Sequence, residues 1–216
     1  SRQEGSLVSR TDAEVRLRSD WSRHELTGEL RGGYLTYPDV EGADRPDGQG
    51  RVNLRIDVLR DTQIDTEARF RLDTQRPGSP DLNAAVSERP LVASGGLSLG
   101  ATHRFNRVIV GLRGSGDRTE YEDAKLSNGA TLDQSDRNVT EYSLRLRAGY
   151  ELTPGVTPFV EAGVDKRVNH SCETCVTSRD SSGVTARIGT TLELTRIVTG
   201  EASVGYQVRD YDDPAV

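Results

Sequence analysis

The residues best suited to metal or redox chemistry are two cysteines, Cys172 and Cys175, with His170 two positions before the first. One histidine and two thiols supply three ligands, one fewer than a structural zinc site uses. The alternating strands and helices of a thioredoxin-like centre are also missing around the pair. In an oxidising setting outside the cytosol, two thiols this close in a loop would form a local disulfide. The sequence therefore predicts a candidate Cys172–Cys175 disulfide, no metal site and no cofactor.

Catalysis would need a nucleophile, a general base and an orienting group within reach of one another. The three histidines, which are the natural bases, fall at a turn (His24), at a strand end (His103) and in a long loop (His170). No serine-centred motif accompanies any of them. We therefore expect that the protein is not an enzyme.

An acidic segment, DVEGADRPDGQG, carries Asp39, Glu41, Asp44 and Asp47. Its spacing does not match a calcium-binding loop, and the closing glutamate of such a loop is missing. The segment is predicted to be a solvated loop. Loose contact with a divalent ion or with lipopolysaccharide is the alternative.

A larger set of charged side chains recurs at every second residue along several segments, so that its members share one face of a strand. In a water-filled lumen such a face would line a pore that favours anionic solutes or polysaccharide. Because acids recur beside the arginines, the same face could instead form a charge network that fills the interior without conduction. The candidate lumen-facing residues are Arg16, Arg18, Arg55, Arg69, Arg71, Arg145, Arg147, Glu161, Asp165 and Arg187.

The elements that must position these charges are strands, because apolar and polar residues alternate strictly on both sides of short turns. In residues 140–167 the two alternating runs flank Pro154 and Gly155, which suit a tight reversal. The predicted strand pairs are 13–21 with 26–34, 52–58 with 64–72, 95–101 with 108–112, 142–150 with 160–164, and 184–192 with 202–208. Long loops are expected at 38–50, 75–90, 122–138 and 168–182. No stretch shows the 3.6-residue period of a helix.

Composition limits the possible classes of protein. A net charge of −6 argues against a nucleic-acid partner. No apolar run approaches the roughly 20 residues of a membrane helix, whereas membrane β-strands need only a half-apolar pattern. Loop lengths that alternate short and long are typical of an up-and-down membrane barrel. The alternative is a soluble antiparallel sheet with one charged face.

The apolar faces are the right size for a membrane. Each run has four or five outward positions, which at about 3.3 Å per residue and a tilt near 40° gives an apolar band of roughly 25 Å. Aromatic residues near the ends of the runs are expected to form the interfacial girdles of such a barrel. They are Trp21, Tyr34, Phe70, Tyr142, Tyr150 and Phe159.

Five stretches, in order along the chain, resemble an alphaproteobacterial outer-membrane β-barrel family of the putative β-barrel porin type. They are RSDWSRHELTGELRGGYLTYPDV, DTQRPGSPDLN, THRFNRVIVGLRGSGDRTEYED, YELTPGVTPFVEAGVDKR and TGEASVGYQVRDYDDP. The resemblance implies an exported barrel embedded in the outer membrane, and family members are longer than this chain. It implies no substrate and no catalytic residues.

The sequence therefore predicts an all-β, antiparallel up-and-down transmembrane β-barrel of about ten strands. Residues 1–216 are expected to form one domain, the N-terminal portion of a larger barrel, although ten strands could also close alone. The expected location is the bacterial outer membrane, in contact with lipid and lipopolysaccharide. The expected function is porin-like passage of hydrophilic solutes or polysaccharide export. The alternative is a non-conducting barrel that presents long loops for surface interactions.

Overall fold

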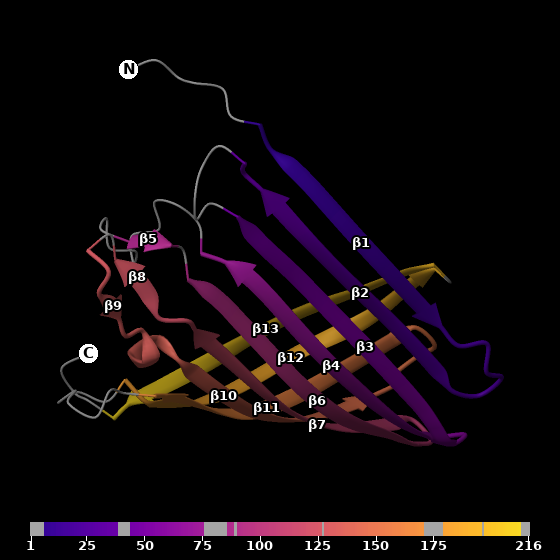
Figure 1. Cartoon of the computed structure of the whole chain (residues 1–216). Helices are drawn as coiled ribbons and strands as arrows, with labels where there is room; N and C mark the ends of the chain where they lie inside the picture. Colours follow the sequence, from indigo (N-terminus) through magenta and orange to yellow (C-terminus); the bar gives the residue numbers. More distant parts are fainter. Residues whose placement is uncertain are drawn as a thin grey trace.

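The computed structural model describes residues 7–38, 44–75, 86–88, 90–126, 128–170, 179–195 and 197–212. Ten strands run antiparallel, each beside the next along the chain, and form one curved sheet (Figure 1). The strands are β1 (Ser9–Arg18), β2 (Glu25–Thr36), β3 (Arg45–Leu59), β4 (Thr62–Thr74), β6 (Leu91–Phe105), β7 (Val108–Tyr121), β10 (Val139–Tyr150), β11 (Val156–Asn169), β12 (Ser181–Thr195) and β13 (Val198–Tyr211). The predicted all-β class and up-and-down order are confirmed.

Short turns join the strands at one end of the sheet, and their residues explain the reversals. Between β10 and β11 the amide of Val156 donates to the carbonyl of Thr153 at 2.9 Å, and Gly155 has a φ of +88°. Pro154 and Gly155 thus occupy the positions of a turn that needs a fixed φ followed by a positive one. Between β6 and β7, Asn106 has a φ of +57°, which asparagine tolerates better than most residues.

The opposite end carries the long connections, and these contain more structure than the sequence indicated. Residues 45–50, expected in a loop, extend β3 and pair with β2 and β4. Two other loops contribute a second small sheet of β5 (Val86–Glu88), β8 (Ala124–Leu126) and β9 (Thr131–Leu132), followed by the short helix η1 (Ser135–Arg137). Hydrogen-bonded pairing between distant segments, which local composition does not reveal, explains both differences.

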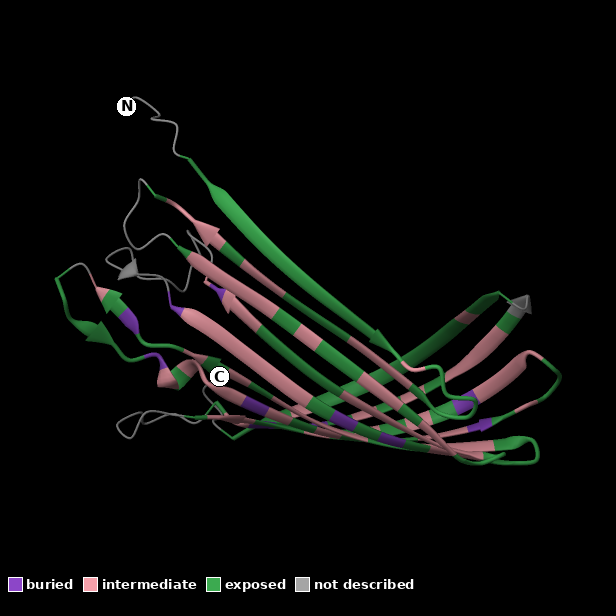
Figure 2. Cartoon of the chain, turned by 45° about the vertical axis from the view of Figure 1, so that its right-hand side comes forward, coloured by how far each residue is buried: buried purple, intermediate pink, exposed green. Residues whose placement is uncertain are grey.

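The described part of the chain has no ordinary hydrophobic core. Its only buried hydrophobic residues are Ala124 and Phe159, while large apolar side chains along the strands are exposed, as Leu97, Leu146 and Val204 are. Figure 2 shows few buried positions anywhere in the sheet. A soluble sandwich would cover these faces with a second layer. No such layer covers the ten-stranded sheet in the described ranges.

The sheet is open. Within the described residues β1 pairs only with β2, and β13 pairs only with β12, so these two strands are its edges (Figure 1). Closure of these ten strands on one another, the alternative considered from the sequence, does not occur in this structure. That residues 1–216 form one domain stays a prediction. None of the described segments is a helix long and apolar enough to cross a membrane.

Candidate functional site

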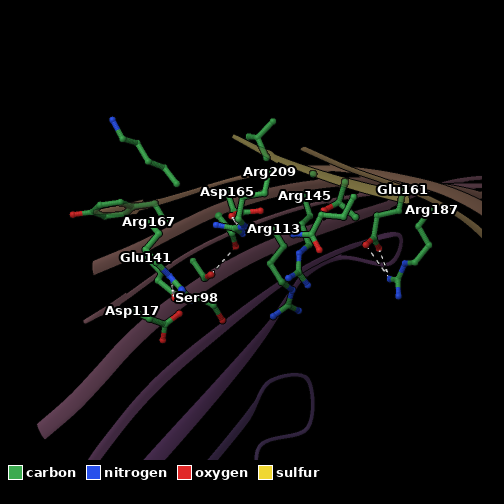
Figure 3. A pocket seen from close by; sticks show the side chains of 18 of the residues that line it. Ser98, Arg113, Asp117, Glu141, Arg145, Glu161, Asp165, Arg167, Arg187 and Arg209 are labelled. Carbon is green, nitrogen blue, oxygen red and sulfur yellow. Dashed lines mark hydrogen bonds and ion pairs between the residues drawn. The ribbon is translucent and has the colours of Figure 1, made fainter. Parts of the chain in front are cut away.

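Charged side chains line a hollow of about 680 Å³ on the concave face of the sheet (Figure 3). Alternation places them there, because most apolar neighbours along the same strands point to the convex face. Of the predicted lumen-facing residues, five line this hollow: Arg69, Arg145, Glu161, Asp165 and Arg187. Other lining residues were not in the sequence prediction: Arg113, Asp117, Glu141, Arg167 and Arg209. They could have been identified, because each lies an even number of residues from other charged residues of its strand and therefore on the same face.

The remaining predicted residues lie beside the hollow or apart from it. Arg71 lines a smaller depression over β2–β4, β6 and β7, and Arg55 lines another over β2–β4 that Arg113 of β7 also borders. Arg16 and Arg18 lie on β1, where every residue is exposed, and Arg18 borders the turn that follows this strand. That these residues line a conducting pore stays a prediction.

Four charged side chains of β10–β13 form a connected network towards the short-turn end. Arg187 donates from one Nη atom to both carboxylate oxygens of Glu161 at 2.9 Å. Arg147 donates to Thr191 Oγ1 at 2.9 Å and to Glu201 Oε2 at 2.8 Å, so it reaches from β10 to β13. Longer contacts of 3.9 Å from Arg147 to Glu161 and 3.7 Å from Arg187 to Glu201 complete the network. The two arginines and two glutamates balance in charge.

The ring of Phe159 packs against the two arginines of this network. Phe159 is 4% exposed, and Cζ of Arg147 lies 3.4 Å from the ring centroid, with that of Arg187 at 5.6 Å. Cation–π contact of this kind stabilises a guanidinium that has lost part of its water. The prediction that Phe159 belongs to an outer aromatic girdle is therefore wrong, because its parity is that of Glu161 and not that of Val160. Tyr34, Tyr142 and Tyr150 are exposed, as a girdle requires.

Further ion pairs cross between strands towards the long-loop end. Arg209 of β13 pairs with Asp165 of β11 and donates to Ser181 Oγ at 2.9 Å. The Arg209–Asp165 pair spans a glycine position. Gly183 lies between Asp165 and Arg209 in the register, and a Cβ added there would approach an Asp165 Oδ1 to 2.6 Å. Glycine thus leaves room for charged side chains to lie flat across the sheet. Arg167 pairs with Glu141 on the adjacent strand, without an intervening glycine.

The β1–β4 wall carries the same residue types in a different arrangement. Its ion pairs mostly join residues two apart on one strand, whose side chains share a face. These same-strand pairs are Arg10–Asp12, Glu14–Arg16, Arg55–Asp57, Glu67–Arg69 and Arg71–Asp73. A longer contact of 3.8 Å joins Arg10 to Asp47 across β2.

The long-loop end has its own polar contacts. Gln134, 6% exposed, donates from Nε2 to the carbonyl of Glu122 at 2.9 Å. Asp133 accepts hydrogen bonds from the amide and hydroxyl of Ser135, which lower the pKa of the Asp133 carboxyl. In the acidic segment, Asp44 accepts from the amide of Tyr37 at 2.9 Å. The predicted Cys172–Cys175 disulfide lies outside the described residues.

The histidines lie apart from one another, at the positions expected from the sequence. His24 Nδ1 accepts from the amide of Asp57 at 3.2 Å, and His103 Nδ1 lies 2.7 Å from Thr62 Oγ1, both near the short turns. His170 follows β11 at the long-loop end. Across the described ranges, no three histidine, cysteine or acidic side chains gather as metal ligands would. That the protein has no enzymatic activity stays a prediction.

Comparison with known proteins assigns a family to this geometry. A search of curated proteins found no match. A family model described as "Putative beta-barrel porin 2" matches residues 1–216, the whole of the sequence. The antiparallel sheet, its exposed apolar face and its charged concave face agree with that description. The chain therefore belongs to the putative beta-barrel porin 2 family and is a porin-like protein of the outer membrane.

Proposed function

We propose that the protein forms a water-filled pore in the bacterial outer membrane, through which hydrophilic solutes pass by diffusion. The observation that carries the proposal is the opposite character of the two faces of the sheet. Charged side chains line the hollow on the concave face, while large apolar side chains stay exposed on the convex face. In water the second face would be a large apolar patch, and such patches mark surfaces that meet a partner or a membrane.

Lipid is the partner that fits the apolar face. Mid-strand residues such as Leu30, Leu146 and Ile188 are more than half exposed and point away from the charges. Hydrocarbon covers such a band without any hydrogen-bonding groups, because the strands satisfy their own backbone in the ladder. Aromatic residues such as Tyr34 and Tyr150 then lie at the membrane interfaces. Lipopolysaccharide would contact the end that carries the long loops.

Mixed charge in the hollow supports passage of hydrophilic solutes in general. Arginine and carboxylate side chains alternate around it, and many keep contact with solvent. Water in the hollow can hydrate these charges, and this wall offers no apolar pocket for a single ligand. Small polar solutes are the expected cargo, and a hydrophilic polysaccharide strand is the larger alternative.

The β10–β13 network favours a second candidate function, a barrel that does not conduct. Arg147 reaches across the two intervening strands, β11 and β12, to Glu201, so charged side chains occupy part of the interior. The small sheet β5–β8–β9 gives the long-loop end ordered structure. A barrel with a filled lumen and structured loops would serve surface interactions.

Conductance in planar bilayers separates the two candidates. The full-length protein, folded in detergent and shown to be heat-modifiable on gels, should give stable single-channel steps that scale with salt concentration. Liposomes containing it should swell in small sugars more quickly than in large ones. A folded, inserted protein that gives neither steps nor swelling would overturn the pore and favour the non-conducting barrel. A chain that stays folded and soluble without detergent would contradict both.

A further inference from the structure

Two arginines in the hollow differ from all the others that line it. All five carboxylates of the lining already form ion pairs: Glu67 and Asp117 with Arg69, Glu141 with Arg167, Glu161 with Arg187, and Asp165 with Arg209. Arg113 and Arg145 remain, and within the described ranges neither has a carboxylate within ion-pair distance. The lining therefore has uncompensated positive charge at these two arginines, and Lys166 of β11 adds a further cation without a described ion pair.

The two arginines are direct neighbours. Arg113 on β7 faces Arg145 on β10 in the strand register. Side chains at such positions have Cβ atoms about 5 Å apart, and like charges placed this way destabilise a sheet. In Figure 3 the two side chains stand beside each other, and no dashed line joins either to a partner. The fold therefore keeps an arrangement that costs stability and that no ion pair relieves.

The nearest acid in the rest of this register row is Asp65, on the far side of a glycine from Arg113, and it forms no ion pair with that arginine. Gly100 faces Arg113, and Gly163 faces Arg145. The Arg113 guanidinium lies over Gly100, where an added Cβ would be 3.3 Å from Nη2. Asp65, beyond Gly100, instead accepts a hydrogen bond from Gln63 Nε2 at 2.8 Å.

Hydroxyl groups occupy the next row towards the long loops. Ser98, Ser115 and Ser143 are successive partners in the register, two residues along each strand from the arginine row. The Ser115 and Ser143 Oγ atoms are 2.8 Å apart, and Ser98 is buried. Two exposed guanidinium groups and adjacent hydroxyls are all hydrogen-bond donors, which is the combination that an oxyanion accepts from.

We propose that Arg113 and Arg145 form an oxyanion-binding site on the lumen wall, which holds the phosphate or carboxylate group of a passing solute. The inference rests on the proposed pore and names the class of solute that the pore favours. A guanidinium presents paired N–H donors that match two oxygens of one anion, so the site would select oxyanions over halide. An anion between the two arginines would also remove their mutual repulsion.

Binding can be measured without conduction. Inorganic phosphate and acetate, the two oxyanion probes, are titrated against the full-length protein in detergent, with ³¹P and ¹³C NMR line widths as the readout. Arg113→Gln and Arg145→Gln should each weaken binding of the preferred probe about tenfold, since each removes charge-assisted hydrogen bonds. Arg71→Gln removes the same charge from the β4 wall and should change affinity less than about twofold, because surface charges act weakly at a distance.

The outcomes separate this inference from the pore. Loss of binding in both hollow variants supports the site even if the wild type gives no channel steps, a result that would overturn only the proposed function. Channels that conduct, with binding equal in wild type and variants, would overturn the site and leave the pore. Absence of binding of either probe to the wild type would also overturn it. Displacement of phosphate by equimolar chloride would mean a diffuse positive potential and would contradict the oxyanion assignment.

Discussion

The β1–β4 wall and the β10–β13 wall place similar charged residues on the concave face and connect them differently. In the first, arginines pair mostly with an acid two residues away on the same strand, and Arg16 and Arg71 keep 76% and 61% of their side chains exposed. In the second, every ion pair described joins different strands, and Glu161 is only 14% exposed.

The difference shows that the contribution of an ion pair to stability depends on whether it joins residues of one strand or of different strands. A same-strand pair lies in high dielectric and links residues that the backbone already holds, so it adds little stability. A cross-strand pair links separate strands and has lost more water, which makes removal of one partner costly. On a concave surface, side chains of non-adjacent strands converge, as Arg147 of β10 and Glu201 of β13 do. The β10–β13 wall should therefore be the more rigid of the two.

The largest expected effect is the loss of the ring beneath the network. Phe159→Ala removes a buried aromatic side chain and its contact with Arg147, and should lower the free energy of unfolding by about 3–5 kcal/mol. Phe70→Ala, on the lipid-facing side of β4, is the matched control and should cost less because lipid fills the space. Urea unfolding in phospholipid vesicles measures both. Equal losses would show that the β10–β13 wall is not specially packed.

Substitution on the lipid face tests whether the difference is confined to the lumen. Leu146→Arg on β10 and Leu30→Arg on β2 should each cost about 2–4 kcal/mol of unfolding free energy, because both place a charge near the bilayer centre. The two walls should behave alike here. Folding into lipid that is unaffected by Leu146→Arg would reverse the assignment of the faces.

Removal of single acids compares the two kinds of ion pair directly. Glu161→Gln leaves Arg187, whose Nε is already buried without a partner, short of a charged acceptor. The expected cost is about 1–3 kcal/mol. Glu14→Gln removes a same-strand partner of Arg16 and should cost about 0–1 kcal/mol. If the two variants unfold at the same urea concentration, connectivity across strands does not matter.

The smallest effect is expected outside both walls. The pKa of Asp133 is lowered by its hydrogen bonds from Ser135, so the stabilisation is present above the ordinary carboxyl pKa and is lost as pH falls through the lowered value. The Ser135 amide should then exchange with deuterium faster relative to its intrinsic rate at acid pH. Asp133→Asn should reduce this pH dependence. A profile that is unchanged by the substitution would remove Asp133 as its cause.

Much of the architecture could be predicted from local sequence because strands alternate with a period of two. That period assigned Leu146 and Arg147 to opposite faces, and Pro154–Gly155 marked a turn that the structure confirms. Prediction failed where a residue's role depends on a distant segment. Residues 45–50 resemble a loop locally yet pair with β2 and β4, and Phe159 resembles a girdle aromatic yet packs under Arg147.

Local sequence accounts for the ten strands of the large sheet, their two faces and the alternation of short and long connections, but not for the short strands β5, β8 and β9. These features depend on the order of residue types along one segment, because successive side chains of a strand point to opposite faces. Tertiary structure alone decided which charges meet. Whether an arginine is neutralised depends on register and on curvature across several strands. Arg147 therefore pairs with Glu201 three strands away, whereas Arg113 and Arg145 face each other and neither forms an ion pair.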